Sequence, residues 1–183
     1  NPNQIFWNGL ARRFRRLMQH NTLLNARRNV AHHYDLGNDF YRLWLDVDLQ
    51  YSCAYFETGN ESLEQAQIAK KRHIASKLAL EPGQTVLDIG CGWGGMALYL
   101  AQVAEVKVVG VTLAEEQLKV ARERAEQVGL ADRVEFRLQD YRDVPETFDR
   151  VVSVGMLEHV GVGHLTEYFL NVRDRLAPEG VAL

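Results

Sequence analysis

Strand and helix signals alternate through residues 61–183, and this alternation constrains the fold more than any other feature of the sequence. Short runs rich in β-branched residues predict strands at residues 85–89, 106–111, 134–138 and 150–154, with a fifth starting at residue 181. Helices are predicted between these strands. Because strands joined through helices form right-handed crossovers, the pattern predicts a parallel sheet covered by helices on both faces. The expected fold class is a doubly wound α/β domain.

The predicted helices carry start and stop signals. Ser62 and Gln65 form a capping box that starts one helix, and a Pro-Gly pair at residues 82–83 stops it. Further helices are expected at about residues 93–104, 115–128 and 165–176. In the last of these an apolar stripe extends to Leu176, and the Pro-Glu-Gly sequence at residues 178–180 ends the helix.

Residues 1–60 differ from the rest of the chain because they are rich in aromatic residues and lack strand periodicity. We interpret them as a basic N-terminal segment and helical lid that packs over the ligand edge of the sheet. Residues 61–183 then form the core. The chain begins at Asn1 without a methionine and ends in an apolar run at residues 181–183. We therefore expect a C-terminally incomplete core, truncated near its fifth strand.

The turn after the first predicted strand is rich in glycine. Gly90, Gly92 and Gly95 satisfy the pattern G-x-G-x-x-G, which lets a backbone turn tightly and approach a nucleotide closely. The pattern alone permits NAD or FAD. Asp88 stands two residues before the first glycine, where a carboxylate can orient the turn or reach a cationic ligand. The second predicted strand ends without the acidic residue that normally holds the ribose of NAD, which argues against a dehydrogenase.

The sequence of this turn, Val-Leu-Asp-Ile-Gly-Cys-Gly-Trp-Gly-Gly, resembles the first motif of class I S-adenosylmethionine methyltransferases. Further segments, in family order, resemble the cyclopropane fatty acid synthase family, which is related to the mycolic acid cyclopropane synthases. They are His-Tyr-Asp-Leu-Gly-Asn-Asp-Phe at residues 33–40, Gln-Tyr-Ser-Cys-Ala-Tyr-Phe at 50–56, Gly-Val-Thr-Leu at 110–113, Leu-Gln-Asp-Tyr-Arg-Asp at 138–143 and Val-Ser-Val-Gly-Met-Leu-Glu-His-Val-Gly at 152–161. The resemblance covers about residues 30–183.

The resemblance implies a Rossmann-like class I methyltransferase sheet under a helical lid, with S-adenosylmethionine as cofactor and S-adenosylhomocysteine (SAH) as its product. The positions that match cofactor contacts lie in the lid, the glycine turn and the segments after the second and third strands. They are Tyr51, Ser52, Gly90, Cys91, Gly92, Thr112, Leu113, Gln117, Asp140 and Tyr141, to which we add Asp88. By this resemblance Gln117 bonds the ribose in place of an acid, and Asp140 and Tyr141 lie at the adenine end.

The resemblance also implies the reaction. Members of the family add a methyl group to the cis double bond of an unsaturated fatty acyl chain and close a cyclopropane ring. Methyl transfer creates a carbocation that must lose a proton, and family members are thought to hold a bicarbonate ion as the base. Cys53 and Glu158 match positions that hold it, and Glu158 would orient the ion by accepting its hydroxyl hydrogen. A histidine and a tyrosine that also hold bicarbonate in the family fall beyond Leu183.

The Asp140-Tyr141 pair resembles the phospholipid-modifying branch, whereas the mycolic-acid branch usually has Gly-Trp there. The expected substrate is therefore an unsaturated acyl chain in a phospholipid. A related enzyme that gives a branched methyl or methylene fatty acid remains an alternative, because the fate of the carbocation depends on the position of the base. An NAD-dependent oxidoreductase and a non-catalytic, membrane-associated binding module are the alternatives from other classes.

Charge is distributed unevenly along the chain, although the net charge is only −3. Residues 1–34 contain six arginines and no acid, so all 24 Asp and Glu residues follow them. A basic segment before an acidic body indicates an anionic partner, although a solvated helix face would show the same pattern. Beside an acyl-modifying core, we interpret it as a peripheral contact with an anionic membrane surface. No base-reading motif accompanies it, so nucleic acid is not expected.

Further features bear on location and partners. No run reaches the apolar length of a membrane span, no signal peptide opens the chain, and two cysteines are too few for a disulfide framework. These features predict a cytoplasmic, peripherally membrane-associated protein. No Cys or His pair has the spacing of metal ligands, so no metal site is expected. Whether the full-length protein forms a homodimer is left open.

Overall fold

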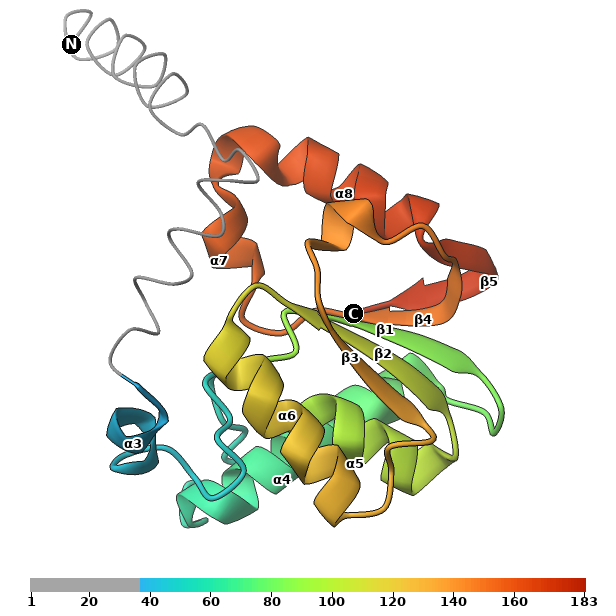
Figure 1. Ribbon diagram of the computed structural model, residues 1–183. Coiled ribbons are helices and arrows are strands. Elements are labelled where there is room, and N and C mark those ends of the chain that lie inside the picture. Colours follow the sequence, from blue (N-terminus) through green and yellow to red (C-terminus); the bar gives the residue numbers. More distant parts are fainter. Residues whose placement is uncertain (1–36) are drawn as a thin grey trace, which may run out of the picture.

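The computed structural model describes residues 37–183 (Figure 1). The described residues form one sheet in the order β3-β2-β1-β4-β5, with neighbouring strands parallel. The strands are β1 (Thr85–Ile89), β2 (Lys107–Thr112), β3 (Val134–Leu138), β4 (Phe148–Val152) and β5 (Leu176–Ala182). The helices are α3 (Gly37–Arg42), α4 (Leu63–Leu78), α5 (Gly95–Ala104), α6 (Glu115–Gln127), α7 (Leu157–Val160) and α8 (Leu165–Asp174), with short 3₁₀ turns η1 (Tyr141–Asp143) and η2 (Val162–His164).

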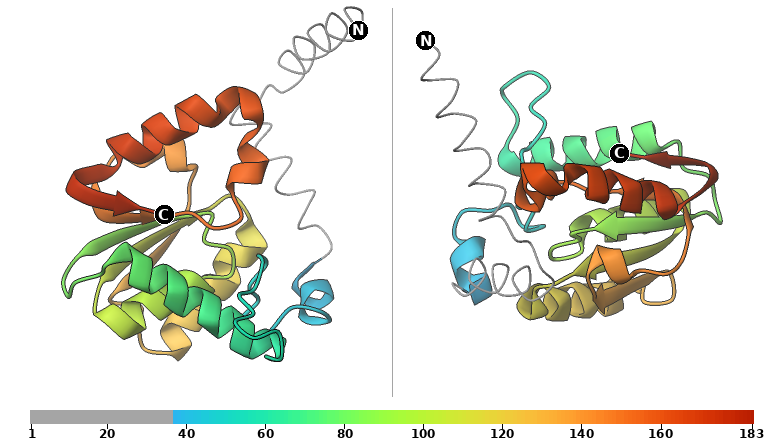
Figure 2. Two further views of the ribbon diagram at one scale, coloured as in Figure 1. Left: turned by 180° about the vertical axis from the view of Figure 1, so that it is seen from behind. Right: turned by 90° about the horizontal axis from the view of Figure 1, so that it is seen from above.

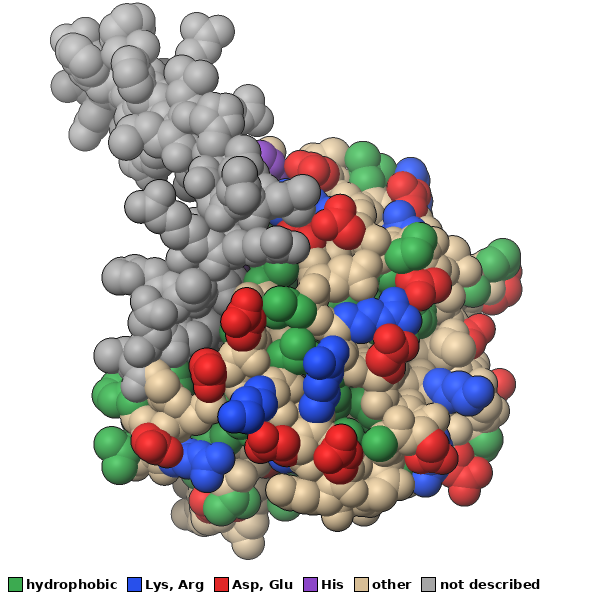
Figure 3. All heavy atoms as spheres, viewed as in Figure 1, with side chains coloured by type: hydrophobic (Ala, Val, Ile, Leu, Met, Phe, Trp, Pro, Cys, Tyr) green, Lys and Arg blue, Asp and Glu red, His purple; other side chains and the backbone are tan. Residues whose placement is uncertain are grey.

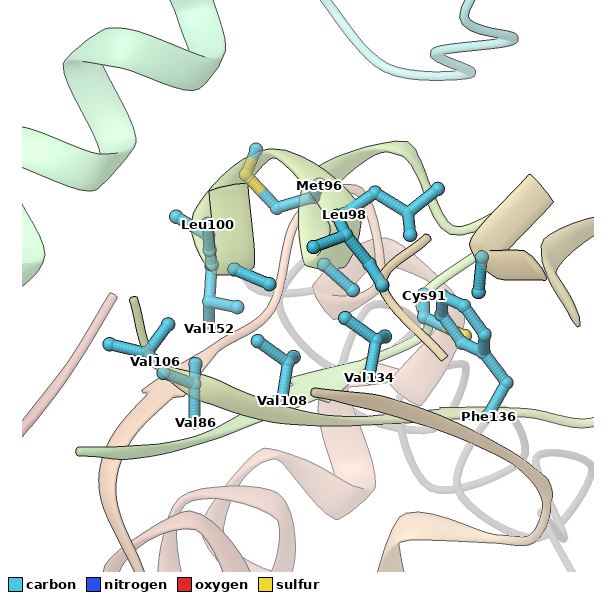
Figure 4. Close-up of a cluster of buried hydrophobic side chains, with 14 of the residues drawn as sticks. Val86, Cys91, Met96, Leu98, Leu100, Val106, Val108, Val134, Phe136 and Val152 are labelled. Atoms are coloured by element: carbon cyan, nitrogen blue, oxygen red, sulfur yellow. The ribbon is translucent and has the colours of Figure 1, made fainter. Parts of the chain in front are cut away.

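Helices cover both faces of the sheet, as the two views in Figure 2 show. On one face α4, α5 and α6 enclose a core in which Val86 and Val108 of the strands point toward Leu100 of α5 (Figure 4). On the other face Leu87 packs with Tyr168 of α8 in a second core. Adjacent residues of β1 thus belong to opposite cores, because side chains alternate along a strand. This architecture confirms the predicted doubly wound α/β fold.

The order of the strands reverses beside β1. From β1 the chain passes through β2 to β3 on one side, and β4 and β5 lie on the other. Asp88 is therefore in register with Gly110 of β2 and with Val152 of β4. In open parallel sheets, ligands bind outside the carboxyl ends of the strands at such a reversal. The glycine-rich turn follows β1 at this position.

The predicted capping box starts α4. The Gln65 amide donates to Ser62 Oγ over 3.3 Å, and the Ser62 amide donates to Gln65 Oε1 over 2.9 Å. Such a cap contributes about 1 kcal/mol to stability because it satisfies backbone groups that the first turn leaves unpaired. The helix ends at Leu78, followed by Ala79 in the left-handed conformation with φ of 46°.

Several predicted boundaries are shifted in the structure; the fifth strand, expected to start at residue 181, begins at Leu176. The helix expected from about residue 93 begins at Gly95, because Gly92 and Gly94 have φ of 54° and 84° and cannot belong to a helix. The strand expected at residues 150–154 is β4, Phe148–Val152. Val154 leaves the sheet and lines a pocket instead.

The prediction for the last helix is wrong at its end. α8 ends at Asp174, and Leu176 is the first residue of β5 rather than the last of an apolar helical stripe. Pro178 lies inside β5, where Glu179 has φ of 65° and the pairing with β4 shifts register. Within residues 37–183, β5 is an edge strand, and an edge strand with a bulge tolerates a proline that lacks an amide donor.

The described part of the predicted lid attaches to the core beside the glycine turn. Tyr41, Leu49 and Trp93 form a small buried cluster, and Trp93 Nε1 donates to Asn38 Oδ1 over 2.7 Å. The Asp48 carboxylate accepts from Lys71 of α4 and from Arg124 of α6. These contacts hold the segment that follows α3 against one end of the sheet.

Side chains of both charges mingle on the face shown in Figure 3. The six arginines of the basic segment lie outside the described residues. The same is true of residues 1–36 of the predicted N-terminal segment and lid. Among the helices within residues 37–183, none combines the length and the apolar character needed to cross a membrane.

Candidate cofactor site

A pocket opens at the carboxyl end of β1, where the strand order reverses. Its wall combines the glycine turn, the lid segment, the first turn of α6 and the loop after β4. The lining residues are Leu49, Gln50, Tyr51, Ser52, Asp88, Gly90, Cys91, Gly92, Trp93, Met96, Gln117, Val154 and Gly155. The structure thus brings together seven of the residues predicted as cofactor contacts: Tyr51, Ser52, Asp88, Gly90, Cys91, Gly92 and Gln117.

The glycine turn is held in place by β2. The backbone amides of Gly90 and Cys91 both donate to the Val111 carbonyl over 3.0 Å. Gly90 has φ of 77° and Gly92 has φ of 54°, which disfavour residues with a side chain. A Cβ added to Gly92 would meet no atom of residues 37–183 within 4 Å, so the described part of the chain leaves this position open. A ligand can therefore approach the backbone of the turn closely.

Asp88 is the buried acidic group of the pocket. Its side chain is 2% exposed, and burial raises its pKa to about 7. Its Oδ2 atom has no hydrogen-bond partner within residues 37–183. A buried carboxylate oxygen without a partner carries a large desolvation cost, which a cationic or hydrogen-bond-donating ligand group would offset. Asp88 thus provides an acceptor aimed at the ligand end of the turn.

Thr112 and Gln117 connect β2 to the pocket. The Thr112 hydroxyl donates to Gln117 Oε1 over 3.2 Å and accepts from the Ala114 amide over 3.2 Å. The Gln117 side chain is buried and lines the pocket, so the bond at its oxygen leaves its Nε2 group as the donor toward a ligand. Leu113 is half-buried and does not line the pocket.

The lid segment meets the loop after β4 at Gly155. A Cβ added there would lie 3.4 Å from Ser52 Cβ, 3.7 Å from the Tyr51 carbonyl oxygen and 3.8 Å from a Glu158 carboxylate oxygen. Glu158 therefore lies at the margin of the pocket rather than in its wall. Cys53 follows Ser52 and is exposed, so it also lies outside the wall.

Asp140 and Tyr141 are not part of this pocket. Asp140 is buried and caps η1, and its carboxylate accepts from Arg142 Nε over 2.9 Å and from Arg142 Nη2 over 2.8 Å. Tyr141 packs edge to face with Tyr168 in the second core, and burial raises its pKa to about 12. The two residues lie one strand beyond β2, at the end of β3.

Sequence reasoning did not single out several residues of the pocket wall. Leu49, Gln50, Trp93, Met96, Val154 and Gly155 all line it. One signal was present: Gly155 directly follows the strand predicted at residues 150–154, and the carboxyl ends of neighbouring parallel strands meet at one edge. The places of Leu49 and Gln50 depend on how the lid folds back, which local patterns do not reveal.

The fold is that of class I methyltransferase structures. The structure of the cyclopropane synthase MmaA2 from Mycobacterium tuberculosis has a TM-score of 0.82 and 38% identity, with 85% of this chain and 55% of that chain covered. A structure of the mycolic acid cyclopropane synthase CmaA1 complexed with SAH and CTAB has the same TM-score, identity and coverage.

The family model described as mycolic acid cyclopropane synthetase matches residues 21–183, and the chain belongs to this family. The cyclopropane-fatty-acyl-phospholipid synthase of Escherichia coli (strain K12) is 54% identical over 151 residues, with 82% of this chain and 38% of the relative covered. A probable fatty acid methyltransferase of Pseudomonas putida is 50% identical over 141 residues, with 76% of this chain and 36% of the relative covered. The chain thus spans well under half the length of these relatives.

Proposed function

We propose that the full-length protein is an S-adenosylmethionine-dependent methyltransferase that acts on the cis double bond of an unsaturated fatty acyl chain and forms a cyclopropane. One observation carries the proposal. In a chain of this family, the Asp88 carboxylate, whose Oδ2 has no hydrogen-bond partner within residues 37–183, converges with the glycine turn and the Gln117 amide on one pocket at the end of β1. The related CmaA1 structure, which is complexed with SAH, supports the same ligand class.

The residues of the pocket fit the parts of S-adenosylmethionine. Asp88 would accept from the ammonium group at the amino-acid end, beside the backbone of Gly90 and Gly92. Gln117 Nε2 would donate to a ribose hydroxyl, and Asp140 with Tyr141 would stand nearer the adenine. The cofactor supplies an electrophilic methyl group. Tyr51 and Ser52 would close the pocket over it, and exclusion of water favours attack by an alkene, which is a weak nucleophile.

We further propose that bicarbonate is the base and that Cys53 and Glu158 hold it. Glu158 stands beside Gly155, against which Ser52 packs, so both proposed ligands border the lid side of the pocket. After methyl transfer, a C–H bond of the carbocation breaks, its electron pair forms the new ring bond, and the proton passes to bicarbonate. A carboxylate that accepts the hydroxyl hydrogen of bicarbonate would orient that ion, and the negative charges would stabilise the cation.

We propose a phospholipid acyl chain as the substrate. The Asp140-Tyr141 pair and the similarity to the Escherichia coli cyclopropane-fatty-acyl-phospholipid synthase both support this assignment. The arginines of residues 1–34 would contact anionic headgroups and bring the pocket to the membrane surface. Co-sedimentation of the full-length protein with anionic vesicles, with and without residues 1–28 of this sequence, tests this contact. Equal binding by both forms would refute it. Light scattering of the same protein tests for a homodimer.

Titration calorimetry tests the cofactor. The full-length protein should bind SAH tightly and NADH weakly, and tight binding of NADH alone would overturn the proposed function. The ring is tested by mass spectrometry of lipid products. A product heavier by one CH₂ group that resists hydrogenation is a cyclopropane, whereas a branched methyl or methylene product would show that the carbocation collapses differently.

The base site is tested by Cys53→Ser and Glu158→Gln in the full-length enzyme. Both variants should lower turnover far more than SAH affinity, because the proposed base acts after the cofactor is bound. Glu57→Gln is a matched control, since Glu57 is an exposed acid of the lid segment that pairs only loosely with Arg72 at 3.6 Å. Full turnover by both base-site variants would remove Cys53 and Glu158 from the mechanism.

A further inference from the structure

The helix α4 turns a row of polar side chains toward the lid segment. Gln67 is 3% exposed, Lys70 is 6% exposed and Lys71 is 7% exposed. Lysine is almost never buried to this extent unless its ammonium group has a partner. The two lysines have different partners, since Lys71 contacts Asp48 while Lys70 Nζ donates to Ser52 Oγ over 2.7 Å.

The contacts of Gln67 and Lys70 fall on the wall of the candidate cofactor pocket. Gln67 Nε2 donates to the Gln50 carbonyl over 3.1 Å and to the Ser52 carbonyl over 3.0 Å. These two carbonyls stand on either side of Tyr51. Three hydrogen bonds from α4 thus fix the backbone around Tyr51 and the side chain of Ser52, and both of these residues line the pocket.

Keeping the ammonium group of Lys70 charged at this buried position costs desolvation free energy. The pKa of Lys70 is lowered to about 8, because burial, with a smaller contribution from Lys71 on the same helix, outweighs Asp46, Asp48 and Cys53 in the facing loop, which raise it. A buried cation whose direct bond goes to a neutral hydroxyl contributes less to stability than an apolar side chain of the same shape would. Packing alone therefore gives no reason for a lysine at this position.

We propose that Lys70 is a positioning residue for cofactor binding, which holds Ser52 and, together with Gln67, fixes the Tyr51–Ser52 wall of the pocket. The inference rests on the proposed function, because it takes the pocket to bind S-adenosylmethionine. Lys70 acts through Ser52, and an unrestrained Ser52 would leave the wall to reorganise at each binding event. Ordering that wall in advance raises affinity because less conformational freedom is lost on binding.

The test compares three variants of the full-length protein by titration calorimetry with SAH at pH 7. Lys70→Met should weaken SAH binding about tenfold, and Lys70→Arg, which keeps the charge and the donor, should restore it to within about threefold. Lys71→Met is the matched control, because it removes an equally buried lysine while Asp48 keeps Arg124. It should lower the melting temperature and weaken SAH binding less than Lys70→Met does, because Lys71 reaches the pocket wall only through Asp48 and Gln50.

A pH series adds a readout that a merely structural role would not move. As the Lys70 ammonium loses its proton above pH 8, the affinity of the wild-type protein should fall relative to Lys70→Arg, whose guanidinium stays charged. The Ser52→Ala variant covers the case that Lys70→Met does not fold, since it removes the acceptor and should also weaken SAH binding. Equal SAH affinity of wild type and Lys70→Met, or equal losses in Lys70→Met and Lys71→Met, would overturn the inference alone. A wild-type protein that does not bind SAH would overturn the proposed function with it.

Discussion

The Thr112 hydroxyl donates a hydrogen bond to the side-chain oxygen of Gln117 over 3.2 Å and so joins the end of β2 to the first turn of α6. The amide of a glutamine can rotate by half a turn at little cost in shape, which would exchange its donor and acceptor ends. Thr112 favours one orientation, because its hydroxyl accepts from the Ala114 amide and donates its hydrogen to the Gln117 oxygen. The Nε2 group of Gln117 is thereby directed away from Thr112.

The Thr112→Val substitution tests this relationship. Valine keeps the shape of threonine but loses the donor, so we expect SAH affinity to fall about fivefold, equivalent to about 1 kcal/mol. Titration calorimetry of the full-length protein measures the change. Thr112→Ser retains the hydroxyl and should bind nearly as well as wild type. Unchanged affinity in Thr112→Val would show that Gln117 needs no such support.

Asp88 should make stability depend on pH. Its pKa is raised by burial from 3.8 to about 7, so the folded chain binds a proton that the unfolded chain releases above pH 4. The free energy of unfolding should therefore fall as pH rises from 4 to 7 and then level off, by up to about 4 kcal/mol for this group. Urea unfolding at a series of pH values measures it.

Asp88→Asn should have opposite effects on stability and binding. The amide has no charge to desolvate, so at pH 8 the variant should unfold at higher urea concentration and lose most of the decline between pH 4 and 7. SAH affinity should fall about tenfold, because the carboxylate that we propose as the partner of the cofactor's ammonium group is gone. A variant that is less stable than wild type at pH 8 would contradict this account of Asp88.

The buried ion pair between Asp140 and Arg142 should matter for stability, because loss of either partner leaves a buried charge uncompensated. Arg142→Met would leave the Asp140 carboxylate, which is 3% exposed, without its guanidinium partner. We expect a loss of about 3 kcal/mol in the free energy of unfolding, measured with urea. The double variant Asp140→Asn with Arg142→Met leaves no charge behind, so it should recover part of the loss. Equal destabilisation by the single and double variants would show that the pair is not the cause.

Gly95 should couple α5 to the lid segment. A Cβ added at this position would clash with the side chains of Gln50 and Asp48, and Gln50 lines the pocket. The backbone of Gly95 is helical, so Gly95→Ala introduces crowding without conformational strain. We expect SAH affinity to fall severalfold, together with about 1–3 kcal/mol of stability. Gly129→Ala is a useful contrast. Its φ is 68°, and an added Cβ would meet no atom of the described residues within 4 Å, so the substitution should lower stability and leave SAH affinity unchanged.

Local patterns in the sequence were sufficient for most of the fold. Alternating strand and helix periodicity predicted the parallel, doubly wound sheet, and the capping box placed the start of α4 at Ser62. These features depend on the preferences of neighbouring residues, so they can be read along the chain. The same approach failed at Leu176, which has helical spacing but is drawn into β5 by pairing of the edge strand with β4.

In the candidate site, too, local features could be predicted from the sequence, whereas contacts between distant segments could not. The glycine turn and Asp88 were recognisable from the sequence, because few residue types can form a tight turn directly after a buried strand. Only the tertiary structure placed Ser52 against Gly155 and buried Lys70 beneath Ser52, because those contacts join segments far apart in the chain. Which side chains face each other across such distances depends on how whole elements pack. The sequence by itself therefore determined the sheet and its turn, whereas packing of the lid segment against α4 decided the wall of the pocket.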